Sequence, residues 1–181
     1  LIEDVATNIP RIDYTTGEGV ILTEPQSTNL IPYSEDFSDA SWSKVGSSVT
    51  SDVGISPNGT QNADLLKGST SSSRHYILKG LASANVSANI SFFAKAKELR
   101  YIQVACQATA NQYANFDVQD GVVGAVGSDF SNAKIEDYGN GWYRCSVVST
   151  NRYTSVWVSL ISGLNSTWLE SWAMPNNTDG L

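Results

Sequence analysis

The sequence predicts an all-β protein, an antiparallel two-sheet β-sandwich of jelly-roll type. About ten short segments either alternate apolar and polar residues or are rich in β-branched and aromatic residues, as strands are. Turn-forming sequences rich in Gly, Asn, Asp and Pro separate these segments at near-regular spacing, which is typical of sandwiches. No segment keeps an apolar period of 3.6 residues over three turns, so no long amphipathic helix is expected.

The chain of 181 residues is long enough for one domain with a sizeable core and short for two. We expect an extended lead over residues 1–18, the sandwich domain over residues 19–175 and a polar tail over residues 176–181. The lead is expected to pack along the sandwich or to reach a neighbouring subunit. Because the first residue is not Met and no signal segment begins the sequence, we expect a processed product or an excised domain of a longer protein.

The first half of the chain is expected to begin with an aromatic plug and to continue with short strands. Two prolines oppose a helix through residues 24–37, and Tyr33, Phe37 and Trp42 supply large rings that we expect to close one end of the sandwich. Ser56-Pro57-Asn58-Gly59 is a strong turn sequence, since Pro presets the first bend and Asn-Gly tolerates positive φ. Short strands are expected at residues 19–22, 47–53, 63–67 and 74–79.

In the second half of the chain, apolar and polar residues alternate more clearly along the expected strands. Gln119-Asp120-Gly121 and Gly139-Asn140-Gly141 are expected as turns between strands. In the strand expected over residues 153–161, the valines and leucine face the core, which leaves Tyr153 and Trp157 on the opposite side. Further strands are expected at residues 86–97, 100–107, 113–118, 122–126, 142–149 and 167–173.

The charge balance excludes some partners. Eleven Lys and Arg residues against 18 Asp and Glu residues give a net charge of −7. Nucleic-acid surfaces need clustered Lys and Arg, so no nucleic-acid partner is expected, and an anionic membrane is disfavoured for the same reason. No apolar run approaches the 18 residues of a membrane span. The balance suits solubility of the protein and binding to neutral partners.

The cysteines and the histidine do not form a recognisable metal or catalytic motif. Cys106 and Cys145 each lie in an apolar strand-like run, which favours buried free thiols, and a disulfide between neighbouring strands is the alternative. One histidine and two distant cysteines cannot supply the usual zinc ligands. His75 has no nucleophile-elbow sequence beside it and is expected on the surface of a strand.

The carboxylates do not predict an enzyme. Glycoside hydrolysis needs two carboxylates close together on one face. Neighbouring carboxylates on a strand point to opposite faces, so neither Glu35-Asp36 nor Glu136-Asp137 forms such a pair by itself. We therefore expect no catalytic residues, and a polysaccharide-degrading enzyme is the least favoured alternative.

A noncatalytic sugar site is expected on the outward sides of the later strands. These sides mix flat aromatic rings with amides, hydroxyls and a guanidinium, and sugars are bound by such mixtures because rings stack on C–H patches while planar polar groups pair with hydroxyls. The alternative is that the rings are ordinary strand formers in cross-strand pairs, and Trp42, Trp168 and Trp172 are assigned to packing. The expected ligand-binding residues are Trp157 and Tyr153, followed by Tyr101, Gln103 and Arg144.

Two ordered blocks carry a resemblance to a known family. The first is EPQSTNLIPYSEDF at residues 24–37, followed by Trp42, with residues 11–14 and 19–22 fitting the same pattern upstream. The second is IEDYGNGWYRC at residues 135–145. With these blocks the chain resembles a β-sandwich module of bacteriophage tail and other virion proteins. It is similar, more loosely, to the jelly-roll, concanavalin A-like carbohydrate-binding modules of secreted glycoside hydrolases.

The resemblance implies a function, a location and a metal. The function is noncatalytic binding of a cell-surface polysaccharide by a phage tail or virion protein, in a virion or extracellular setting, with other virion subunits or further copies of this chain as partners. The alternative is a structural or assembly domain without a glycan ligand. Jelly-roll modules often hold a structural Ca²⁺ between first and last strands, so Glu35 or Asp36 and Glu170 would be its ligands. The ending Trp168-Leu169-Glu170-Ser171-Trp172 lacks the usual closing Asp, which weakens that expectation.

Overall fold

A computed structural model of the protein describes residues 11–13, 20–22, 29–81, 87–106, 110–149 and 154–175. Every regular element in these ranges is a β-strand, so the all-β prediction is confirmed. The chain divides into two compact units, Leu1–Leu30 and Ile31–Leu181. In the first unit, β1 (Arg11–Asp13) pairs antiparallel with β2 (Val20–Leu22), which confirms the short strand expected over residues 19–22.

The second unit contains a six-stranded and a three-stranded sheet, and all their strand pairs are antiparallel. The larger sheet has the order β10-β9-β8-β13-β6-β3, and the smaller has the order β11-β12-β7. The strands of the larger sheet are β3 (Trp42–Val45), β6 (His75–Gly80), β8 (Tyr101–Cys106), β9 (Tyr113–Asp117), β10 (Val122–Val126) and β13 (Ser155–Leu160). The strands of the smaller sheet are β7 (Ala88–Lys95), β11 (Phe130–Asp137) and β12 (Trp142–Ser149). A separate hairpin joins β4 (Ser47–Gly54) and β5 (Ala63–Gly68).

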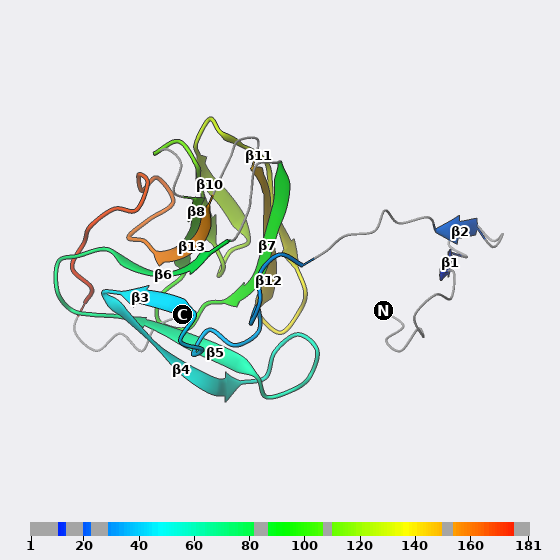
Figure 1. The fold of residues 1–181 in the computed structure, drawn as a ribbon, viewed down its shortest axis with the longest axis horizontal. Helices are drawn as coiled ribbons and strands as arrows, with labels where there is room; N and C mark the ends of the chain where they lie inside the picture. Colours follow the sequence, from blue (N-terminus) through cyan, green and yellow to red (C-terminus); the bar gives the residue numbers. More distant parts are fainter. Residues whose placement is uncertain are drawn as a thin grey trace. The chain divides into compact units, whose positions relative to one another are not determined.

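The two sheets enclose one hydrophobic core. Alternate residues of β8 and β13, among them Val104 and Val158, meet alternate residues of β7 and β12, among them Ile90 and Val147. The Phe92 ring of the smaller sheet lies edge-on to the Phe116 ring of the larger sheet, with centroids 6.0 Å apart. Figure 1 shows β7, β11 and β12 forming one layer beside β8, β10 and β13. The arrangement is sandwich-like, as the alternation of the second half predicted.

The two cysteines lie in this core. Cys106 of β8 and Cys145 of β12 are both fully buried and both free, which confirms the expectation of free thiols. Burial raises the pKa of each thiol to about 12, because the apolar surroundings disfavour the charged thiolate. Both cysteines therefore act as small apolar core residues.

The expected aromatic plug packs on the core, with one exception. Trp42 is buried, its ring lies edge-on to the Phe37 ring at 5.0 Å, and its Nε1 donates to the carbonyl oxygen of Tyr33 over 2.9 Å. The Phe37 amide donates to Asp64 Oδ2 over 2.8 Å, which ties the plug to β5. Tyr33 itself is exposed, and its ring lies 5.3 Å from the Lys79 ammonium.

The strand prediction differs from the structure in four places. Strands β1 and β3 were not predicted, since residues 11–13 were assigned to the extended lead and residues 42–45 to no element. Strand β11 was not predicted, because Asn132 adopts a positive φ of 51° at an irregularity in pairing that interrupts the alternation. The strand expected over residues 167–173 is wrong: this segment is irregular and makes only the isolated bridge between Trp172 and Ser73. It belongs to residues 162–174, which we call the strap. Residues 166–169 lie over the face of the large sheet turned away from the core, whereas Trp172 and Met174 pack with the core cluster at the edge of that sheet.

Candidate functional site

Trp157 is buried, so the expectation that its ring is exposed on the sheet is wrong. The residue does lie opposite Val156 and Val158, as expected, but only 7% of it is exposed. Its ring stacks on Tyr76 at 4.9 Å and meets Trp168 of the strap at 5.7 Å, in a second apolar cluster with Leu169. Both sides of β13 are therefore interior, one against the core and one against the strap.

Gln103 is also committed to the strap rather than to a ligand. It is fully buried, its Nε2 donates to Asn115 Oδ1 over 2.7 Å and to the Thr167 carbonyl over 3.1 Å, and its Oε1 accepts from the Leu169 amide over 2.8 Å. Asn115 Nδ2 in turn donates to the Ser166 carbonyl over 2.8 Å. The side-chain amides of Gln103 and Asn115 thus bind the backbone of the chain itself, whereas outward-facing amides were expected to bind sugar hydroxyls.

Of the two tyrosines expected in the groove, the structure describes Tyr101 only. Tyr153 lies outside the described residues. Tyr101 is half-buried, and the Arg100 guanidinium lies 5.1 Å from its ring centroid. Arg100 is in turn held by two carboxylates, so this corner of the molecule is a structural ion-pair network.

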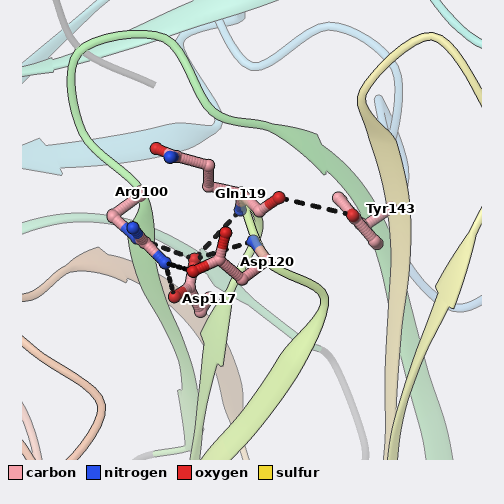
Figure 2. A network of polar contacts seen from close by, with 5 residues as sticks. All are labelled: Arg100, Asp117, Gln119, Asp120 and Tyr143. Carbon is pink, nitrogen blue, oxygen red and sulfur yellow. Dashed lines mark hydrogen bonds and ion pairs between the residues drawn. The ribbon is translucent and has the colours of Figure 1, made fainter.

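Figure 2 shows the Arg100 guanidinium between the carboxylates of Asp117 and Asp120. Arg100 Nε donates to Asp117 Oδ1 over 2.9 Å, and the same oxygen accepts from the Gln119 amide over 3.0 Å. Burial alone would raise the pKa of Asp117, but the hydrogen bonds from Arg100, Gln119 and Asp120 outweigh burial and lower it. The Tyr143 hydroxyl donates to the Gln119 carbonyl over 3.4 Å, which links this turn to β12.

His75 is buried rather than exposed, which corrects the prediction of a surface histidine. Its Nδ1 lies 2.7 Å from the carbonyl oxygen of Gly46, and its Nε2 lies 3.0 Å from that of Trp172. The Trp172 ring packs edge-on against the imidazole, with centroids 5.9 Å apart. His75 therefore joins the β3–β4 corner to the strap.

The carboxylates expected to bind Ca²⁺ do not come together. Glu35 and Asp36 are exposed in the plug, where Asp36 Oδ1 accepts from the Ser38 and Asp39 amides at 3.0 and 3.1 Å. Glu170 Oε1 accepts from the Ser166 hydroxyl over 2.6 Å within the strap. No group of three or more His, Cys, Asp or Glu side chains among the described residues is arranged to hold a metal ion. These residues do not fit the expected calcium site.

Arg144, the remaining predicted residue, lies on the outer side of the small sheet. Glu136 and Phe93 are its direct neighbours on either side, and its Nη1 lies 3.4 Å from Glu136 Oε2. Phe93 is 43% exposed and packs edge-on against the exposed Tyr138, with centroids 4.9 Å apart. Trp142 and Lys95 form the next cross-strand pair towards the end of the sheet. This side combines aromatic, cationic and polar groups.

A pocket of about 230 Å³ lies at that end, between the β4–β5 turn and the β11–β12 turn. It is smaller than the roughly 300–1,000 Å³ of sites for drug-sized ligands, so it suits one small ring. The Trp142 Nε1 donates to the Ile55 carbonyl over 3.0 Å and ties the two turns together across 87 residues of sequence. The pocket is lined by Ile55, Ser56, Pro57, Gly59, Lys95, Tyr138, Gly139, Asn140 and Trp142.

Both turns are fixed by their own hydrogen bonds. Asn140 has a φ of 53° between two glycines that also have positive φ, and the Trp142 amide donates to the Gly139 carbonyl over 2.9 Å. On the other side of the pocket, Asn58 Oδ1 accepts from the Thr60 amide over 2.9 Å, and Gly59 has a φ of 87°. The pocket walls are therefore held before any ligand arrives.

The sequence contained part of this site. Arg144 was expected on the outward side of its strand, and both turn sequences were recognised. Their meeting was not predictable, because the Trp142–Ile55 hydrogen bond depends on how the β4–β5 hairpin packs and not on local pattern. Tyr138, Asn140 and Lys95 were missed for that reason.

Comparison with known proteins finds no relative of this chain: no known family matches it, and no curated protein matches it. The part of the chain that the structure describes also contains no helix that could span a membrane.

Proposed function

We propose that this protein is a noncatalytic carbohydrate-binding module of a phage tail or virion protein, with a sandwich of jelly-roll type. The pocket at the end of the small sheet binds one sugar ring of a cell-surface polysaccharide. The observation that carries the proposal is the pairing of two partly exposed rings, Tyr138 and Trp142, with the Asn140 amide on rigid turns.

The chemistry of the lining suits a pyranose. Aromatic faces stack on its C–H groups, each contact contributing on the order of 1 kcal/mol, and an amide both donates to and accepts from hydroxyls. The pocket lining contains no carboxylate side chain, whereas glycoside hydrolysis uses two, which favours binding over cleavage. One such site binds weakly, so we expect the protein to gain affinity from several copies displayed together.

The test is a glycan array probed with the protein in multivalent form. The wild type is expected to bind at least one polysaccharide, and Tyr138→Ala is expected to bind it about fivefold more weakly per site, since about 1 kcal/mol of stacking is lost. Tyr33→Ala is the matched control, because Tyr33 is a similarly exposed tyrosine that does not line the pocket. Absence of binding to every glycan at high avidity would refute the proposal.

A structural or assembly role is the second candidate, and the β1–β2 hairpin favours it. This hairpin belongs to a compact unit of its own, Leu1–Leu30, and two strands of three residues cannot bury a core in isolation. Contact with a further subunit would stabilise it. Light scattering of the full chain and of a chain lacking residues 1–30 tests this role: a defined oligomer that requires these residues supports it, and a monomer in both cases contradicts it.

A further inference from the structure

We infer that the sugar held in this pocket carries a carboxylate, so that the ligand is an acidic polysaccharide built from uronic or sialic acids. The inference rests on the proposed function and names the ligand class of the same pocket. It departs from the neutral partner that the overall charge of −7 suggested.

The charge of the lining is opposite to that of the whole molecule. Among the lining residues only Lys95 is charged at neutral pH, and it is a cation. The nearest acidic residue in sequence, Asp137, turns its Oδ1 onto the Gly139 amide at 2.7 Å and does not line the pocket. A carboxylate entering the pocket therefore meets a positive group at its wall.

The Lys95 side chain lies beside the turn between β11 and β12. It is the last residue of β7 and pairs with Trp142 across the sheet. A Cβ atom added to Gly141 would lie 3.3 Å from Lys95 Cε, so the lysine stem passes directly over this glycine. Because Gly141 has no side chain, the stem can lie along the turn, and Lys95 lines the pocket together with Trp142.

The Lys95 ammonium is available for a ligand. Of the cations on this side of the sheet, Arg144 is paired with Glu136, whereas none of the ion pairs among the described residues uses Lys95. An exposed lysine–carboxylate pair raises affinity only about three- to fivefold, and added salt weakens it. Repetition of the acidic sugar along a polymer, met by several copies of the module, multiplies this preference.

The experiment compares acidic polysaccharides with their own neutral forms. Binding is measured to polygalacturonate, alginate, hyaluronan and polysialate, each beside its carboxyl-reduced counterpart, at low and high salt. The wild type is expected to prefer at least one acidic form about three- to fivefold per site at low salt. Lys95→Gln is expected to abolish this preference, whereas Lys134→Gln, an exposed lysine of the same sheet outside the pocket, is expected to keep it.

The outcomes separate the two proposals. Equal binding to acidic and reduced forms, or a preference that Lys95→Gln leaves intact, would overturn the acidic ligand. If Tyr138→Ala weakened binding to both forms in that case, the pocket would stand as a site for neutral sugars. No binding to any glycan, here or on the array, would overturn both.

Discussion

At the scale of single residues, Asp117 shows how the protein uses a buried charge. Its side chain is 3% exposed, and it accepts hydrogen bonds from Arg100 and from the backbone of the turn that follows β9. A buried carboxylate is stable only when such partners replace water. The same partners lower its pKa, so the residue also links stability to pH.

Replacing Asp117 should therefore make the free energy of unfolding depend less on pH in the acidic range. A carboxyl whose pKa is lowered in the folded state stabilises the fold at pH values above its unfolded-state pKa of about 3.9. This stabilisation is lost as the pH falls through the folded-state pKa. Asp117→Asn is expected to reduce the free energy of unfolding by about 1–3 kcal/mol at pH 7 and to weaken its fall below pH 4, measured by urea unfolding at several pH values.

The control for Asp117 is Asp120→Asn. Asp120 contacts the same arginine, but its side chain is 59% exposed, so a change within about 0.5 kcal/mol is expected. An equal loss in both variants would contradict the central role of Asp117.

The two cysteines give a second prediction at this scale. Because burial raises the pKa of Cys106 and Cys145 to about 12, neither should form a thiolate or react with a thiol reagent in the folded protein near neutral pH. Labelling with a chromogenic disulfide should report no thiols before denaturation and two after it. Rapid labelling of the native protein would show that one strand opens.

At the scale of elements, the strap covers part of the large sheet and so determines which of its side chains are exposed. Alternation along β13 correctly predicted which side chains share a side, because strand geometry fixes that from sequence alone. It could not predict exposure, since Trp157 and Gln103 are covered by residues that come later in the chain. The strap itself escaped prediction because its backbone is bonded by side-chain amides rather than by a strand ladder.

Gln103→Leu should loosen the strap. The substitution leaves the Leu169 amide, the Thr167 carbonyl and the Asn115 amide oxygen without their buried partner, which costs about 2–4 kcal/mol of unfolding free energy. Faster hydrogen exchange is expected at the Leu169 amide, measured by mass spectrometry. Gln61→Leu, at an exposed glutamine, should change stability by less than about 0.5 kcal/mol and leave that exchange unchanged. Unaltered exchange in Gln103→Leu would contradict the role given to this amide.

At the scale of the whole molecule, the pocket exists only when two distant turns are folded together. The sequence predicted most of the strands and both turns, but the contact between the β4–β5 hairpin and Trp142 is tertiary. Of the predicted residues that the structure describes, Arg144 alone lies on the side of the sheet that leads to the pocket, since this side is open whereas both sides of β13 are covered. The strand pattern thus predicted the strands far better than the position of the pocket.

A ligand that needs both turns must stabilise the whole fold. Saturation at about 100 times the dissociation constant adds about 2.7 kcal/mol, which raises the melting temperature by several degrees for a domain of this size. Differential scanning fluorimetry should show this shift for the glycan identified on the array. Tyr138→Ala should shift less at the same ligand concentration, and a shift equal to that of the wild type would place the ligand elsewhere.

The strap also has a consequence for the order in which the protein can mature. A ribosome completes every strand of the large sheet before it reaches residue 162, so the nascent chain must carry Trp157 and Tyr76 uncovered until residues 162–174 have emerged. A translation product ending at Ile161 would lack the covering segment altogether, so its Trp157 and Tyr76 rings would stay open to chaperones or to other copies of the chain.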